Sequence, residues 1–139
     1  MVPYKQLEHV SDLCIKSSGR TREELFVHSA RGMMAYLFGE KKWNKGEKNS
    51  LKKIHLTALD LETLMVDWLS ELLYLSTTRG KVYFDFKLNI KEKDSVFSLY
   101  AQSKFIAARI RKEIKAVTFH GLKVEQRKGI WQAVVIYDL

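Results

Sequence analysis

The sequence predicts an α+β fold in which two principal helices pack on an antiparallel or mixed β-sheet. Two stretches with apolar residues at helical spacing follow strand-like segments in the first half of the chain. After Gly80 the apolar spacing changes to every second residue, and several strand-like segments follow one another with short connections. Short connections favour antiparallel pairing. We interpret residues 1–139 as a single domain, because this length fits one core and the chain contains no flexible linker.

The chain is predicted to begin with a strand and then a helix. The strand covers Tyr4 to Ile15, with an irregular portion around His9 to Asp12. Thr21 and Glu24 form the pattern of a capping box, in which the threonine hydroxyl accepts from the N–H of the third helical residue and the glutamate reaches back to the cap. Apolar residues at helical spacing then predict a helix from Arg22 to Phe38.

A lysine-rich segment over residues 40–53 separates this helix from the next strand. Its lysines are Lys41, Lys42, Lys45, Lys48, Lys52 and Lys53. A solvated connection typically has this composition. Phosphate contacts, with Trp43 stacked on a base, are the functional alternative. Trp43 can equally fold back onto the domain, and the sequence alone leaves these interpretations open.

The second helix follows a predicted strand over Lys53 to Thr57. Asp60 fits as its cap, and the helix is expected to end between Thr77 and Gly80. One broad face of this helix is apolar: Leu61, Leu64, Met65, Trp68, Leu69, Leu72 and Leu73. We interpret these large side chains as core residues rather than as a cofactor site.

Alternating apolar residues predict a half-buried strand over Val82 to Leu88. A turn is expected over Lys91 to Asp94, followed by a strand over Val96 to Ala101. Ser103 to Lys115 is ambiguous, because its apolar residues lie among many cations. The segment fits a short helix that leads into a strand.

The last part of the sequence predicts a hairpin. Lys115 to Gln126 and Ile130 to Asp138 are the expected strands, with the turn at Arg127-Lys128-Gly129. The final strand is apolar over Trp131 to Tyr137, so both of its faces are expected to be covered.

Composition limits the class of protein and its partners. Cys14 is the only cysteine, which excludes an internal disulfide and indicates a reducing, cytoplasmic location. No stretch reads as a secretory signal or is apolar enough to span a membrane. The formal net charge of +8, from 24 basic and 16 acidic residues, favours polyanionic partners such as RNA.

Familiar enzyme signatures are absent from the sequence. It contains no P-loop, no dinucleotide-binding glycine fingerprint, no nucleophile elbow and no paired-histidine helix motif. The four histidines are scattered, and a single cysteine excludes a thiolate zinc cluster. These absences direct attention to oxygen ligands.

Two acidic positions interrupt apolar surroundings. Asp138 closes the last strand beside the main-chain carboxylate of Leu139, and two negative groups so close repel each other unless a cation lies between them. Asp12 lies between His9-Val10-Ser11 and an apolar stretch, although aspartate is a poor strand former. Taken singly, Asp138 also fits a solvated chain end, and Asp12 a turn or cap.

Five segments in order resemble the archease family, and the resemblance covers nearly the whole chain. They are His9-Val10-Ser11-Asp12, Glu23-Glu24-Leu25-Phe26, Asp67-Trp68-Leu69-Ser70-Glu71-Leu72-Leu73, Lys115-Ala116-Val117-Thr118-Phe119-His120 and Asp138-Leu139. Each is modest alone, but their order and the match at the last residue make the signal specific.

The resemblance implies a divalent metal held by Asp12, Asp138 and the terminal carboxylate of Leu139. Three oxygen ligands suit calcium, although another divalent cation also fits. The resemblance further implies a non-catalytic protein that activates an RtcB-type RNA ligase in tRNA splicing and RNA repair. It would promote guanylylation of the ligase and permit multiple turnover. Lys115 is a candidate for a helper residue near that interface, and it equally fits a solvated strand lysine.

This sequence departs from the family pattern at several positions. Val10 and Ser11 replace threonine and alanine, Cys14 stands where glycine is common, and Phe119 replaces tyrosine. Many archeases are acidic, whereas this chain is basic, so its contact with the ligase or with RNA is expected to differ in detail.

Two other functions remain open at this stage. The first is a stand-alone RNA-binding module that uses residues 41–53 and 104–115. The second is a metal-dependent hydrolase that uses the same carboxylates, for which the sequence offers no obvious general base.

Overall fold

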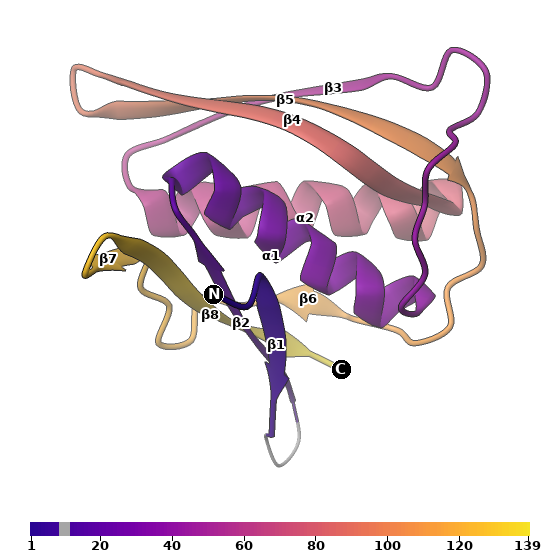
Figure 1. Cartoon of the computed structure of the whole chain (residues 1–139), viewed down its shortest axis with the longest axis horizontal. Coiled ribbons are helices and arrows are strands. Elements are labelled where there is room, and N and C mark those ends of the chain that lie inside the picture. The colour runs from indigo at the N-terminus through magenta and orange to yellow at the C-terminus, as the bar shows by residue number, and fades with distance from the viewer. Residues whose placement is uncertain (9–11) are drawn as a thin grey trace.

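The computed structural model describes residues 1–8 and 12–139, so the predicted irregular portion at His9 to Ser11 lies outside the described residues. The described residues form two helices and eight strands in three layers (Figure 1). Helices α1 (Arg22–Phe38) and α2 (Leu61–Arg79) make up the middle layer, between a three-stranded sheet and a five-stranded sheet. This arrangement confirms the α+β class and the packing of both predicted helices on antiparallel strands.

The five-stranded sheet joins the two ends of the described chain. Its strands are β1 (Tyr4–Leu7), β2 (Leu13–Gly19), β6 (Ala116–Val117), β7 (Glu125–Arg127) and β8 (Ile130–Asp138). The order is β1-β2-β8-β6, β7 also pairs with β8, and every pairing is antiparallel. Strand β8 therefore lies in the centre and pairs with the most neighbours.

The three-stranded sheet covers the opposite side of the helices. We call it the upper sheet and the five-stranded one the lower sheet, after their places in Figure 1. Its strands are β3 (Lys52–Ala58), β4 (Lys81–Lys93) and β5 (Val96–Ala107), in the antiparallel order β3-β5-β4. The β4–β5 register shifts between Phe84 and Lys87, where Asp85 has a positive φ of 53°. Beyond this bulge, strand alternation turns one face of the sheet toward the helices and the other outward.

Local signals set the helix ends. The Thr21 hydroxyl accepts from the Glu24 N–H at 3.0 Å, as predicted, whereas the Glu24 carboxylate accepts from the N–H of Arg20 at 3.1 Å, one residue before the cap. Helix α2 begins after Asp60, whose carboxylate accepts from the Thr63 N–H at 2.6 Å. Gly80 ends it in a left-handed conformation that glycine adopts without strain.

Trp68 lies where the two helices meet the upper sheet. Its side chain is fully buried, and its indole N–H donates to the Phe26 carbonyl of α1 at 3.0 Å. Its ring meets Phe86 of β4 edge-on, with centroids 5.6 Å apart. The prediction that the large apolar residues of α2 belong to the core is confirmed.

Several predicted strands have different limits in the structure. The first strand is a hairpin of β1 and β2 rather than one strand over Tyr4 to Ile15. Residues 103–107 continue strand β5 instead of forming a helix, and residues 108–115 have no regular structure. The segment over 115–126 contains two short strands, although the turn before β8 is at Lys128-Gly129 as predicted.

The strands are divided between two sheets instead of forming one. Residues 108–115 cross the end of α1, where the Arg111 N–H donates to the Leu37 carbonyl at 2.7 Å. This crossing takes the chain from the upper sheet to the lower one. The expectation that both faces of β8 are covered was wrong, because the helices lie on one face only: Ala133, Val135 and Tyr137 are buried, and Val134 and Ile136 are half-buried. No helix among the described residues is long and apolar enough to cross a membrane.

Candidate metal centre

The pairing of β2 with β8 brings the two ends of the sequence together. Leu13 is paired with Tyr137, and both side chains are 1% exposed on the face toward the helices. Asp12 directly precedes Leu13 and Asp138 directly follows Tyr137, so the register of this pair brings the two aspartates to the same end of the strands. Because side chains alternate along a strand, Asp138 lies on the face that turns away from the helices, while Asp12 just before β2 is half-buried.

The position of Asp138 follows from the pattern of the strand. Ala133, Val135 and Tyr137 point into the core at every second residue. Tyr137 is fully buried, and this desolvation raises the pKa of its phenol, so the side chain stays neutral at physiological pH. An inward Tyr137 requires an outward Asp138, which is exposed.

Strand β6 holds the end of β8 from the other side. Ala116 is paired with Asp138, and the Lys115 N–H donates to the Asp138 carbonyl at 2.8 Å. The Thr118 N–H and hydroxyl both donate to the Ile136 carbonyl, at 3.0 and 2.8 Å. Sequence reasoning missed this role of Thr118, although the residue stands inside the run that resembles the family. The main chain around Asp138 is therefore fixed between two strands.

These positions supply a donor set of hard oxygens. Two side-chain carboxylates and the main-chain carboxylate of Leu139 are suited to calcium, which prefers such ligands. No group of three His, Cys, Asp or Glu side chains in the described part of the chain could hold a metal ion. A metal ion bound here would need oxygen ligands besides the two aspartates, such as the main-chain carboxylate of Leu139, water or a partner's oxygens.

Lys115 lies at the same edge, where its main chain bonds to Asp138 and its side chain is exposed. The other predicted cationic positions are not gathered there. Lys104 pairs with Asp85 of the upper sheet at 2.9 Å. Lys112 lies over the Tyr36 ring of α1, 5.2 Å from its centroid.

The lysine-rich segment is attached to the domain by its own side chains. Trp43 is half-buried against the core, and the Lys41 ammonium lies 4.6 Å from the centroid of its ring. Glu47 accepts from the Lys81 ammonium and from the Ala107 N–H. Trp43 thus folds back onto the domain, and Glu47 joins this segment to the end of β5.

The structure defines a three-layer α+β protein in which the end of the central strand β8 lies beside the start of β2. The sequence model of the Archease protein family (MTH1598/TM1083) matches residues 4–139. The chain belongs to this family.

Relatives of known sequence and structure cover almost the whole chain. Protein archease of Methanosarcina barkeri is 34% identical, over 98% of this chain and 95% of its own length. The solution structure of Methanobacterium thermoautotrophicum protein 1598 superimposes with a TM-score of 0.84 at 27% identity, over 99% of both chains. A Thermotoga maritima protein described as an archease and possible chaperone gives a TM-score of 0.57 at 25% identity, over 97% of this chain and 96% of its own.

Proposed function

We propose that this protein is a non-catalytic activator of an RtcB-type RNA ligase in tRNA splicing and RNA repair. Membership of the archease family supports this role, and so does the description of the Thermotoga maritima relative as a possible chaperone. The observation that supports the proposal is the pairing of Leu13 with Tyr137, because Asp12 and Asp138 are the next residues along these two antiparallel strands. A divalent cation held between neighbouring carboxylates would offset their mutual repulsion.

The cation in this proposal is calcium or a similar divalent ion, held by Asp12, Asp138 and the main-chain carboxylate of Leu139. Asp138 is exposed at the end of β8, so a ligase can approach the ion without disturbing the core. Oxygens of the ligase would then complete the coordination shell. Lys115, fixed beside Asp138, would contact an acidic group of the ligase in the same interface.

The activator acts in this scheme by binding one conformation of the ligase more tightly than another. Tighter binding to the guanylylation-competent state raises its population, because a ligand shifts an equilibrium by its differential affinity. The guanylylated histidine belongs to the ligase, so no catalytic residue is placed in this chain.

Ligase guanylylation tests the proposal. Labelled GTP is incubated with the ligase and an RNA substrate, alone or with the wild-type protein, Asp138→Ala or Asp67→Ala. The last variant removes an exposed aspartate of α2 and serves as the control. We expect multiple turnover with wild type and Asp67→Ala and little with Asp138→Ala. Equal activation by all three proteins would remove the carboxylate edge from the function.

Calorimetric titration with calcium tests the metal site without the ligase. Wild type and Asp67→Ala should bind the ion, while Asp12→Asn and Asp138→Asn should bind it much more weakly, because each loses a charged ligand. Unchanged calcium affinity in both Asn variants would refute this ligand set.

A further inference from the structure

The outward face of the three-stranded sheet carries a chemical pattern that the metal centre does not use. Both helices lie on its inward side, so within the described parts of the chain no helix covers this face (Figure 1). Three cross-strand rows point outward from β3, β5 and β4: Lys53–Gln102–Lys87, His55–Tyr100–Asn89 and Thr57–Ser98–Lys91. We refer to these nine residues as the outer face.

An aromatic stack occupies the middle row of the outer face. The rings of His55 and Tyr100 are 4.4 Å apart between centroids and 9° from parallel. Tyr100 is 46% exposed, and the Lys91 ammonium lies 5.9 Å from its ring centroid. A partly exposed aromatic ring whose other face is supported by His55 is available to stack on another planar group.

The same residues line a hollow of about 570 Å³. Its lining includes Lys53 and Lys87 on either side, with Tyr100 between them. The amides of Asn89 and Gln102 complete the polar lining. This volume lies within the range of sites that hold small organic groups, about 300–1,000 Å³.

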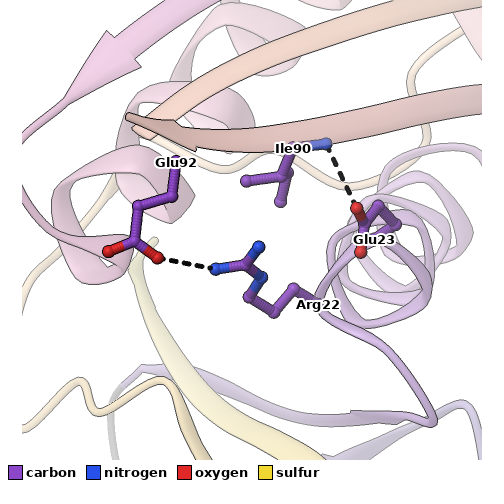
Figure 2. Close-up of polar contacts among 4 residues, drawn as sticks. All are labelled: Arg22, Glu23, Ile90 and Glu92. Atoms are coloured by element: carbon purple, nitrogen blue, oxygen red, sulfur yellow. Dashed lines mark hydrogen bonds and ion pairs between the residues drawn. The ribbon is translucent and has the colours of Figure 1, made fainter. Parts of the chain in front are cut away.

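The outer face is positive because its neighbouring acids are neutralised or turned away. Asp85, beyond the bulge in β4, pairs with Lys104 at 2.9 Å. Glu92 of β4 turns toward α1, where Arg22 binds it at 3.4 Å, as Figure 2 shows. In the same view, Glu23 of α1 accepts from the Ile90 N–H at 3.3 Å. None of the nine outer-face residues is acidic, while three are lysines.

We propose that the outer face binds single-stranded RNA. One base stacks on the Tyr100–His55 pair, and Lys53, Lys87 and Lys91 contact the flanking phosphates. Asn89 and Gln102 offer both donors and acceptors to base edges. The choice of RNA over DNA rests on the proposed function. The stacking and phosphate contacts are inferred from the residues of the outer face alone. A duplex keeps its bases paired and stacked on one another, so it has no free base that could stack on Tyr100.

Fluorescence anisotropy with a labelled single-stranded RNA of roughly ten nucleotides tests the proposal, using the isolated full chain. Tyr100→Ala should weaken binding on the order of tenfold, because it removes the stacking ring. Tyr100→Phe keeps the ring and should bind within about twofold of wild type. Tyr74→Ala removes another exposed tyrosine, from α2, and should have no effect. Thermal unfolding of each variant confirms that it is folded.

The salt dependence of RNA affinity tests the phosphate contacts. Lys87→Ala should reduce the slope of log affinity against log salt by about 0.7, the value for one phosphate contact on a single strand. Lys123→Ala, which removes an exposed lysine outside the outer face, should leave that slope unchanged.

Several results would overturn the proposal. Equal affinity of wild type and Tyr100→Ala, equal binding of duplex RNA, or no binding of single-stranded RNA would each do so. If light scattering shows that the wild type is a dimer and that Tyr100→Ala is a monomer, the outer face is a homodimer interface instead. A DNA strand bound as tightly as RNA would refute the choice of RNA.

These outcomes are separable from those of the activator function. Asp138→Ala should bind RNA normally, and Tyr100→Ala should still support ligase guanylylation. Loss of RNA binding from the outer face with intact activation would refute only this inference.

Discussion

Trp68 shows how one side chain connects the layers. It is fully buried, it donates to a carbonyl of α1, and it meets Phe86 of the upper sheet. Its removal would leave a cavity that three elements would have to fill together. The cost of such a cavity depends on how little the surroundings can collapse.

Trp68→Ala should lower the free energy of unfolding by about 3–5 kcal/mol, the usual range for a large buried aromatic. Equilibrium unfolding in urea measures this loss. Tyr74→Ala changes an exposed aromatic on the same helix and should stay within about 0.5 kcal/mol of wild type. Similar losses in both variants would show that burial at Trp68 does not set the effect.

The N-terminus of helix α2 is capped by the carboxylate of Asp60. Asp60 accepts from the Thr63 N–H, and this hydrogen bond lowers the pKa of Asp60. A lowered pKa in the folded state means that the ionised cap stabilises the fold above the ordinary aspartate pKa of about 3.9. The stabilisation is then lost as pH falls through the lower pKa of the folded state.

Asp60→Ala should destabilise the protein by about 0.5–2 kcal/mol at neutral pH, as for other N-cap losses. The difference from wild type should shrink at pH 2, because an ionised cap contributes less to stability below the ordinary aspartate pKa. Urea unfolding at both pH values measures it. Asp60→Asn keeps a cap without the charge, so it should lose less stability at neutral pH. A difference that is the same at both pH values would contradict the role of ionisation.

The two helices could be predicted because their signals are local. Thr21, Asp60 and Gly80 each act within a few residues of the helix end that they set. The strand over 103–107 was misread because Phe105 and Ile106 among cations fit either periodicity. Residues 104–107 form a strand because they pair with β4, and the sequence of this segment does not reveal that partner.

The proposed metal site and the outer face differ in how much of each could be predicted from the sequence. Asp12 and Asp138 were singled out by the resemblance and by their odd placement, but their placement at the same end of the two strands depends on the β2–β8 register. The outer face was missed entirely. His55 and Tyr100 alternate with apolar residues in their own strands, yet nothing local reveals that they are paired. Long-range register is the information that residue patterns do not contain.

At the scale of the whole molecule, Glu47 fastens the long loop between α1 and β3 to the upper sheet. Its carboxylate accepts from Lys81 at the start of β4 and from the Ala107 N–H at the end of β5. Its own N–H donates to the Phe105 carbonyl at 3.0 Å. The bond with Lys81, and then the one with Ala107, lowers the pKa of Glu47, so the attachment persists at neutral pH.

Glu47→Ala should speed tryptic cleavage within residues 40–51 several-fold while leaving global unfolding nearly unchanged, because it frees a loop and no core residue. Mass spectrometry of timed digests locates the cuts. Glu113→Ala, an exposed glutamate outside the loop, is the matched control and should digest like wild type. Slower or unchanged cleavage in Glu47→Ala would show that other contacts hold the loop.

The central place of β8 has a consequence for how the protein is made. A ribosome delivers this strand after every other element described, yet β2, β6 and β7 all pair with it. Until it emerges, the lower side of the helices has no complete cover, and Asp12 lacks the second aspartate of the proposed site. The nascent chain is therefore dependent on its final strand both to hide apolar surface and to assemble its proposed ion site. Synthesis halted just before that strand would yield an aggregation-prone product, because the apolar side of the helices would stay exposed.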